Sequence, residues 1–493
     1  MLVLGEGGTG KTALIRAITE TFRHYTKLNI LAKCATTGIA ATDIEAYTLH
    51  SWAGLTHSFP KGDDWLDRSS VVSQDKRNKN IHGKEFLIVD EVSMEDKTTA
   101  YYLSEIIGKT RALEGKGRPH EPFGSMHVIK FGDFHQFPPV GNATGALYVD
   151  RPDKDSKHAL IGREIFLQFN KVVILDKQNR IKDKVWVDIL SRLRIGECTQ
   201  NDLDEIRKLV LTNPECDVPD FSKPPWDQAI LVTPRHTVRN LWNEHAITKH
   251  CAKTGNQQYL IPAEDTSRDG ETLTMEAKLA TASLEDKKTG KLPVFVRMAI
   301  GMKAMVLLNL ATEADVANGT RGHIQDIVLD EREGLCVPNE DGVVELKYPP
   351  AMIIFKPDKE TKLTFEGLPP GVIPLTPSLA TFTATGRTGK SFKLARRQYA
   401  MTAGYAFTDY KLQGQTIEYV IIDIGKPPTG TLSPFSAYVA LSRSRGRDTV
   451  RLLRDFDDNL FQNHPSEALR REMIRLEGLN EATRREWDRR QTQ

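Results

Sequence analysis

Short apolar runs alternate with amphipathic stretches over the first third of the chain. Four of the runs are compact enough to be buried strands, and polar or turn residues separate them. They lie at residues 2–4, 28–32, 86–89 and 127–131. Strands that alternate with helices are typical of a parallel sheet covered by helices. The pattern predicts an α/β domain over residues 1–167, with a polar inserted subdomain at about 51–84.

A second α/β pattern begins near residue 168. Apolar runs at residues 172–175 and 229–232 flank a helical stretch at 185–193. A helix between two apolar strands again favours a sheet with helical cover. We therefore assign residues 168–321 to the first part of a second α/β domain.

A β-rich segment interrupts this second domain. Between residues 322 and 396, strand-like runs such as 351–355 and 379–383 are separated by Gly and Pro, which favours a small inserted β module. The α/β pattern resumes over residues 397–455. The last residues, 456–493, carry dense charge of both signs, which is typical of a solvated helix.

The composition is typical of a soluble globular protein, with 39% hydrophobic and 27% charged residues. Because 67 Lys and Arg nearly balance 65 Asp and Glu, binding to nucleic acid would need a local basic groove. No apolar run approaches the roughly 18 residues that suggest a membrane span. The five cysteines lie far apart without a CxxC pair, so we expect buried free thiols rather than a zinc site or disulfides. They are Cys34, Cys198, Cys216, Cys251 and Cys336.

The first chemical motif lies between the first predicted strand and a helical stretch. It matches the phosphate-loop pattern GxxxxGK(S/T) and consists of Gly5, Glu6, Gly7, Gly8, Thr9, Gly10, Lys11 and Thr12. Glycines let backbone N–H groups curl around phosphates, and the next helix offers its positive end. We expect Lys11 to reach the β- and γ-phosphate oxygens and Thr12 to bind Mg²⁺. The motif predicts an ATP-binding site.

A second strand ends in two carboxylates. Residues 86–89 are apolar and run directly into Asp90 and Glu91. At the carboxyl edge of the same sheet, Asp90 would lie near the Mg²⁺ bound by Thr12. Glu91 is then free to polarise the attacking water as a general base.

A third strand end continues as the sequence GDFHQF. Its neutral amide, Gln136, can hold the lytic water or sense the γ-phosphate without competing for the proton. Phe134 and Phe137 fit a core position and base stacking equally well.

Hydrolysis of ATP also needs positive charge against the γ-phosphate. The second predicted domain offers Arg180, in the sequence QNR, and Arg443, in VALSR. An arginine that binds best when the triphosphate is present links the nucleotide state to domain closure.

Six sequence blocks together resemble one family. They are GEGGTGKT, ATTGIAA (35–41), IVDEVSM (88–94), GDFHQFPPV (132–140), YKLQGQT (410–416) and YVALSR (438–443). Their order and spacing over about residues 1–455 are similar to those of the PIF (petite integration frequency) family of DNA helicases, superfamily one, subgroup B. The resemblance implies two RecA-like P-loop NTPase domains with ATP in the cleft, and an SH3-like β insertion in the second.

The resemblance also implies roles for single residues. It supports the roles given above for the ATP site, with Gln136 as the γ-phosphate sensor and Arg180 and Arg443 as two arginine fingers. It further implies a set of residues in segments that track single-stranded DNA. These are Thr37, Gly38, His50, Thr408, Lys411 and Gln413.

The family's activity gives an expectation for this chain. It implies an ATP-dependent helicase that moves five-prime to three-prime on single-stranded DNA, as a monomer, and unwinds tailed duplex DNA away from membranes. The resemblance implies roles in DNA repair, in recombination, in the response to DNA damage and in telomere maintenance. We expect a nuclear location, and the mitochondrion is also compatible.

The chain departs from the family at three places. Position 36 is Thr where Pro is usual, and position 410 is Tyr where His is usual. The family has residues ahead of the phosphate loop, including a glutamine that contacts adenine, whereas four residues precede Gly5 here. We expect weaker base selectivity and, through Tyr410, weaker coupling between DNA and ATP.

Two other functions compete with a helicase. A truncated, element-derived remnant would bind single strands without unwinding DNA. A phosphate-loop kinase or GTPase would need a lid or a base-recognition motif, and neither is found. That last alternative also leaves the YVALSR block unexplained.

Overall fold

A computed structural model describes residues 1–55, 71–118, 120–268, 273–310, 316–359, 364–408, 417–427, 431–463 and 465–492. The chain forms two compact units. Unit 1 comprises Met1–Pro234 together with Asp409–Gln493, and unit 2 comprises Arg235–Thr408. No helix within the described ranges has both the length and the apolar character that crossing a membrane requires. The domain boundaries inferred from the sequence stay predictions.

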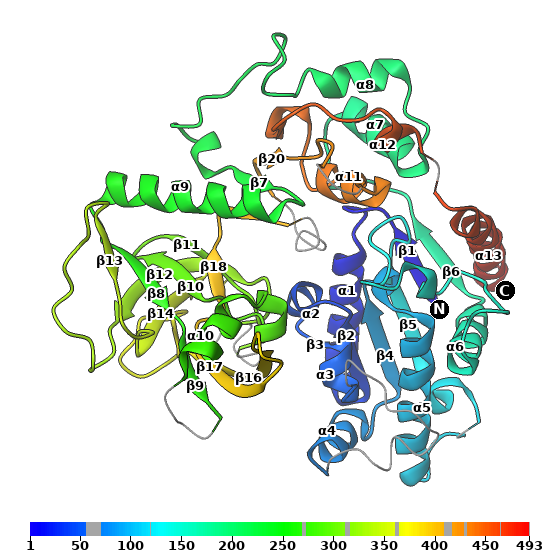
Figure 1. Cartoon of the computed structure of the whole chain (residues 1–493). Helices are drawn as coiled ribbons and strands as arrows, with labels where there is room; N and C mark the ends of the chain where they lie inside the picture. Colours follow the sequence, from blue (N-terminus) through cyan, green and yellow to red (C-terminus); the bar gives the residue numbers. More distant parts are fainter. Residues whose placement is uncertain are drawn as a thin grey trace. The chain divides into compact units, whose positions relative to one another are not determined.

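Six parallel strands form the main sheet of unit 1, in the order β3-β2-β4-β5-β1-β6 (Figure 1). The strands are β1 Leu2–Gly5, β2 Leu31–Ala35, β3 Tyr47–Thr48, β4 Phe86–Asp90, β5 His127–Gly132 and β6 Val172–Leu175. Their side chains alternate between two cores, with Leu2 and Leu4 in one and Val3 in the other. Because the strands are parallel, the carboxyl ends of β1, β4 and β5 meet at one edge of the sheet.

Helices cover both faces of this sheet. Helices α1 and α2 supply one core, and the other core takes residues from α3, α4, α5 and α6. The helices are α1 Lys11–His24, α2 Gly38–Asp43, α3 Leu49–Ala53, α4 Val71–Ile81, α5 Lys97–Leu113 and α6 Lys157–Leu167. The predicted α/β arrangement of the first domain is therefore confirmed.

Two sequence expectations for this domain need adjustment. The strand predicted at residues 28–32 starts later, because Leu28–Ile30 form a 3-10 turn and β2 begins at Leu31, where pairing with Phe86 starts. Of the predicted polar insertion, residues 56–70 lie outside the described ranges. The described residues of this segment do not all lie on the surface, since Trp52 of α3 is 3% exposed and joins the core.

A second parallel sheet in unit 1 contains β7, β20 and β21. These strands and the accompanying helices are β7 Ile230–Val232, β20 Val420–Ile422, β21 Val450–Leu452, α7 Lys184–Ile195, α8 Gln200–Arg207, α11 Pro434–Leu441 and α12 Asn459–Gln462. The side chain of Asp183 caps α7 by accepting from the Trp186 N–H, and Gly196 ends the helix in the left-handed region. These caps fix the length of α7, which carries Arg194 in its last turn.

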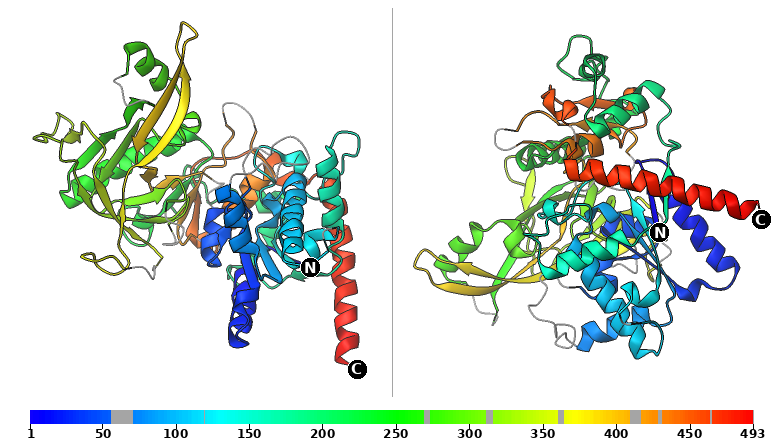
Figure 2. Two further views of the ribbon diagram at one scale, coloured as in Figure 1. Left: turned by 90° about the horizontal axis from the view of Figure 1, so that it is seen from below. Right: turned by 90° about the vertical axis from the view of Figure 1, so that its right-hand side faces the viewer.

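The charged C-terminal segment is helical, as predicted, but it is not simply solvated. Helix α13, Glu467–Gln491, is the long red helix at the end marked C in Figure 2. It packs along the edge strand β6, and its leucines join the core. Asn480 Oδ1 accepts from the Ile174 N–H, and Thr483 Oγ1 accepts from the Val172 N–H, both at 3.0 Å. These side chains satisfy the outward N–H groups of an edge strand that would otherwise invite pairing with another chain.

Unit 2 is mainly antiparallel β structure beside helices α9 and α10. Its sheets have the orders β15-β14-β12-β11-β18, β10-β8-β13 and β16-β17-β9. The predicted strands at 351–355 and 379–383 are present as β14 and β16, whereas β8 to β11 form where the sequence suggested α/β structure. The elements are α9 His236–Thr254, β8 Gln258–Pro262, β9 Glu264–Ser267, α10 Met275–Ala282, β10 Phe295–Ala299, β11 Lys303–Val306, β12 Arg321–Val328, β13 Val343–Glu345, β14 Met352–Pro357, β15 Ile373–Leu375, β16 Ser378–Thr385, β17 Ser391–Gln398, β18 Met401–Ala403 and β19 Ala406–Phe407.

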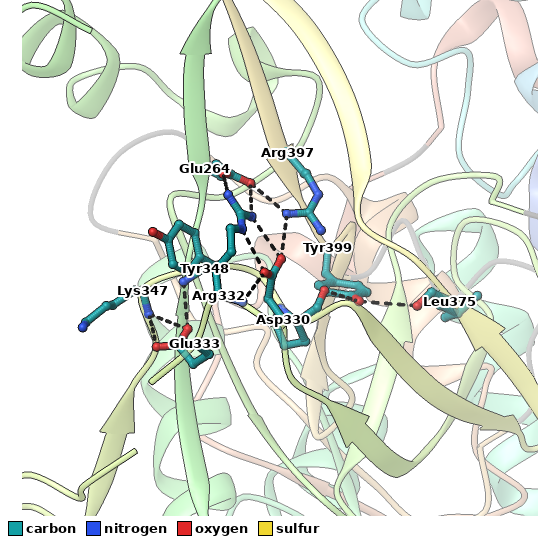
Figure 3. Close-up of polar contacts among 10 residues, drawn as sticks. Glu264, Asp330, Arg332, Glu333, Lys347, Tyr348, Leu375, Arg397 and Tyr399 are labelled. Carbon is teal, nitrogen blue, oxygen red and sulfur yellow. Dashed lines mark hydrogen bonds and ion pairs between the residues drawn. The ribbon is translucent and has the colours of Figure 1, made fainter. Parts of the chain in front are cut away.

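An ion-pair cluster fastens the turn after β12 to β9 and β17 (Figure 3). Arg332 donates to Glu264 at 2.8 Å and to Asp330 at 2.9 Å, and its guanidinium lies 4.0 Å from the centre of the Tyr348 ring. Arg397 donates to the same glutamate at 2.8 Å. Hydrogen bonds from Arg332 lower the pKa of Asp330. The cluster is a structural brace of unit 2.

All five cysteines are free thiols. Cys34 and Cys198 are buried, as predicted. The expectation of burial is wrong for the other three, which are partly exposed: Cys216, Cys251 and Cys336.

Candidate active site

The phosphate-loop motif forms the turn between β1 and α1. Gly8 and Gly10 have φ angles of 95° and 94°, a region that side chains with a Cβ rarely adopt. At Gly8 a Cβ would also lie 2.2 Å from Oε1 of Gln178. The loop and the N terminus of the 14-residue helix α1 therefore line a pocket with backbone N–H groups suited to phosphate.

Lys11 lies folded over this loop. Its ammonium donates to the carbonyl oxygens of Gly5 at 2.6 Å and Glu6 at 2.9 Å. Burial lowers the pKa of Lys11, and the nearby carboxylates of Asp133 and Glu91 oppose that effect. Phosphate oxygens carry full charge, so they can replace the two carbonyl acceptors with stronger bonds.

The two predicted acidic residues lie at the end of β4. Asp90 and Glu91 are 6% and 5% exposed. Burial, followed by the charge of Glu91, raises the pKa of Asp90 to about 7. Glu91 has φ 57° and ψ 48°, a left-handed conformation that is uncommon without glycine. Such backbone strain gathers at functional sites, and both residues line the same pocket as Lys11.

Thr12 and Asp90 also line this pocket together. Hydroxyl and carboxylate oxygens are the protein ligands that Mg²⁺ prefers, and Mg²⁺ usually takes its other ligands from water and phosphate. Within the described ranges, no group of three or more His, Cys, Asp or Glu residues could hold a metal. Thr12 and Asp90 therefore fit a Mg²⁺ ion that binds together with a nucleotide.

Gln136 follows β5 and is 2% exposed. Its Oε1 is buried and has no hydrogen-bond partner among the described residues, yet the residue lines the pocket. An unsatisfied buried acceptor is unfavourable, and a bound water would satisfy it. Phe134 and Phe137 are 2% and 1% exposed, so both are core residues and the stacking alternative is wrong.

The two predicted arginines converge on the phosphate loop. A methyl group built on Gly7 would lie 3.2 Å from Nη2 of Arg443 and 3.3 Å from Nη1 of Arg180. Arg180 donates to the Ser442 carbonyl at 3.1 Å. Burial and the neighbouring charge of Arg443 lower the pKa of Arg180 to about 9. Two partly desolvated cations beside a phosphate loop favour a multiply charged anion.

The segment that carries Arg180 is anchored to the loop by its neighbours. Nε2 of Gln178 donates to the Gly7 carbonyl at 3.0 Å, and the Asn179 N–H donates to the Gly8 carbonyl at 2.9 Å. Both anchors escaped prediction, because only the arginine of the sequence QNR has a recognisable chemical role.

The loop glycines, the acidic pair, Gln136 and the two arginines line one cavity of about 1280 Å³, larger than the roughly 300–1,000 Å³ of ordinary ligand sites. The cavity extends past the phosphate loop over residues of α8 and the segment that precedes β21. The structure therefore brings together Lys11, Thr12, Asp90, Glu91, Gln136, Arg180 and Arg443, as the sequence predicts.

A buried charge cluster lies behind the loop and was missed by sequence reasoning. Asp133 accepts from Arg194 at 2.8 Å, from the His135 N–H at 3.1 Å and from the Tyr438 hydroxyl at 3.3 Å. Glu6 lies 3.6 Å from Arg194, so its side chain points into this cluster. Burial alone would raise the pKa of Asp133, but Arg194 and His135 hold it well below its ordinary value.

The residues expected to contact DNA are only partly placed. Thr37 caps α2 by accepting from the Ala40 N–H, and Gly38 is the first residue of that helix. His50 lies in α3, and Thr408 is the last residue of unit 2. The remaining predictions, Lys411, Gln413 and the departure at Tyr410, lie outside the described residues.

Comparison with known proteins identifies similar helicases. The family model described as PIF1-like helicase matches residues 1–203. The ATP-dependent DNA helicase PIF1 of Emericella nidulans is 24% identical over 485 residues, covering 94% of this chain and 59% of that protein. Human PIF1 is 24% identical over 462 residues, covering 92% and 58%. The chain thus spans about three fifths of the length of these curated relatives.

Solved structures show the same fold. The Pif1 helicase from Candida albicans matches with a TM-score of 0.66 at 21% identity, covering 96% of this chain and 94% of that one. Bacteroides Pif1 in complex with ADP-AlF3 and ssDNA matches with a TM-score of 0.64 at 20% identity, covering 97% and 93%. The predicted α/β class with two RecA-like domains is confirmed. In motifs and in fold, this chain resembles the PIF1-like helicases over nearly its whole length.

Proposed function

We propose that this chain is an ATP-driven DNA helicase that moves five-prime to three-prime on single-stranded DNA and unwinds tailed duplexes. One observation carries the proposal. The phosphate loop, two carboxylates, two arginines and an amide whose oxygen has no hydrogen-bond partner among the described residues surround a single cavity. A nucleic-acid-binding remnant has no need to retain this complete set.

Each side chain has a role in hydrolysis. Lys11 and the loop N–H groups bind the β- and γ-phosphates, and Gln136 orients the lytic water. Glu91 accepts the proton of that water as it attacks. Magnesium, held by Thr12 and Asp90, would neutralise charge that develops on the phosphates.

The two arginines link hydrolysis to movement. Their guanidiniums repel each other at the phosphate loop, and a γ-phosphate between them relieves that repulsion. After phosphate release that favourable contact is lost, so the equilibrium shifts away from the arrangement in which Arg180 and Arg443 lie against the loop. A ligand shifts a conformational equilibrium through such differential contacts.

Thr37, Gly38 and His50 of unit 1, with Thr408 of unit 2, are the described candidates for DNA contact. The chain would act as a monomer on single strands and tailed duplexes. The family resemblance supports roles in DNA repair, recombination and telomere maintenance, in the nucleus or the mitochondrion.

Unwinding of duplexes with either a five-prime or a three-prime tail tests the proposal. We expect ATP-dependent unwinding of the five-prime-tailed substrate and ATPase activity that single-stranded DNA stimulates. Glu91→Gln lowers stimulated hydrolysis by at least about 100-fold, the scale of a lost general base, and Lys11→Ala lowers it because the β- and γ-phosphates lose their cation. Lys223→Ala, at a lysine 77% exposed, is the matched control. Unwinding of three-prime tails alone refutes the polarity, and DNA binding without unwinding supports the remnant alternative.

A further inference from the structure

Thr36 joins the end of β2 to the general base. The register pairs Ala35 with Asp90 as the last residues of β2 and β4. Beyond that pair, the Thr36 N–H donates to the Asp90 carbonyl at 3.2 Å, and the Thr36 hydroxyl donates to the Glu91 carbonyl at 2.9 Å. One residue therefore holds two consecutive carbonyls of the acidic turn.

The acidic turn depends on such restraints. Glu91 occupies the left-handed region, which a residue with a side chain keeps only when its surroundings impose it. The Glu91 N–H donates to Asp90 Oδ1 at 2.8 Å. On the β5 side, a Cβ on Gly132 would lie 2.9 Å from the Val92 nitrogen. The Thr36 hydroxyl restrains the carbonyl of Glu91 from the opposite side, just beyond the end of β2.

The next two residues are the candidates for DNA contact. Thr37 caps α2 and Gly38 begins it. Because Thr36 is bonded directly to Thr37, DNA that displaces the start of α2 also displaces Thr36. A proline at position 36 would have neither an N–H nor a hydroxyl, so both contacts to the acidic turn require a residue such as threonine.

We propose that Thr36 is a positioning residue that transmits DNA contact at Thr37 and Gly38 to the orientation of Glu91. The inference rests on the proposed helicase function and names the regulation of its ATP site. When DNA fixes the start of α2, the Thr36 hydroxyl fixes the Glu91 peptide and thereby the direction of its carboxylate. Hydrolysis then accelerates without a change in nucleotide binding.

Thr36→Val removes the hydroxyl and keeps the branched shape, and Thr36→Ser restores the hydroxyl. We expect Thr36→Val to lower the ratio of DNA-stimulated to basal kcat about tenfold, with the KM for ATP and the Kd for a labelled single strand within twofold of the parent. Thr36→Ser restores the ratio to within twofold. Thr19→Val is the control, because the buried Thr19 hydroxyl makes the same kind of bond to the Ile15 carbonyl at 2.8 Å, inside α1.

The outcomes separate the two proposals. A parent protein whose ATPase ignores single-stranded DNA refutes the helicase function and the coupling with it. A stimulated parent with an equally stimulated Thr36→Val variant refutes the coupling alone. The coupling also fails if Thr19→Val loses as much stimulation as Thr36→Val, or if the loss in Thr36→Val follows a weaker Kd for DNA.

Discussion

Arg194→Met removes the one guanidinium that pairs with the buried Asp133 carboxylate among the described residues. Asp133 has a fully buried side chain, and the side chain of Arg194 is 17% exposed. Breaking a buried ion pair from one side costs about 3–5 kcal/mol, because a charge is left without compensation. The His135 N–H and the Tyr438 hydroxyl still donate to Asp133. We therefore expect the lower end, about 3 kcal/mol.

Thermal unfolding followed by circular dichroism measures this loss. For a domain of about 150–250 residues, 1 kcal/mol shifts Tm by about 2–4 °C, and for the larger unit 1 the lower value gives a fall of about 6 °C. Arg470→Met is the control, since Arg470 and its partner Glu467 are 52% and 55% exposed. An exposed pair of this kind contributes about 0.5 kcal/mol or less.

A double variant tests the physical reason. If the penalty in Arg194→Met comes from an unpaired buried charge, then adding Asp133→Asn removes that charge and recovers part of the lost stability. A double variant less stable than Arg194→Met would contradict the argument. So would an Arg194→Met protein that melts together with Arg470→Met.

Three further outcomes are expected. The depressed pKa of Asp133 means that its stabilisation is fully present above its unfolded pKa of about 3.9 and is lost as the pH falls through the folded pKa. Urea melts at pH 7 and pH 3 should therefore show a larger difference between the parent and Asp133→Asn at pH 7. Burial, with the charge of Asp202 second, raises the pKa of Cys198 to about 12, and burial also raises that of Cys34. Iodoacetamide at pH 8 should leave both unmodified until urea is added, as mass spectrometry can show. Asn480→Ala and Thr483→Val should each cost about 1 kcal/mol and speed hydrogen exchange in β6, and unchanged exchange would argue against the contacts of α13.

The parts of the ATP site that the sequence predicts share one property. Each lies at the end of a buried strand or in the turn that follows it, as Asp90 ends β4 and Gln136 lies in the turn after β5. In a parallel sheet the carboxyl ends of such strands gather at one edge, so local patterns suffice to bring these residues together. Arg180 and Arg443 needed the family resemblance in addition, because an isolated arginine is usually a surface residue.

Contacts between distant segments were beyond prediction. Arg194 lies in the last turn of an ordinary amphipathic helix, and its partner Asp133 is 61 residues away. The hydroxyl of Tyr438 reaches the same carboxylate across 305 residues. Nothing in the local pattern distinguishes these side chains from others of their kind. The phenylalanines after β5 show the same limit, because only the packing of Phe134 against Tyr148 and Phe166 identifies it as a core residue.

The β-rich unit was recognised only in part. Strands β14 and β16 have clear apolar runs, whereas β9, Glu264–Ser267, has the sequence EDTS without an apolar residue. Its pairing with β17 depends on ion pairs such as Asp265 with Arg396 at 2.7 Å. A strand stabilised by charge has no hydrophobic period to detect.

The sealing of β6 by α13 sets an order of events during protein synthesis. The N–H group of Ile174 donates to the side chain of Asn480, which is synthesised 306 residues later. At about 5–20 residues per second, the ribosome needs about 15–60 s to cover that distance. During this interval the sheet that carries the phosphate loop keeps an open edge. Chaperones that cover exposed strand edges would therefore act on the nascent chain before α13 replaces them.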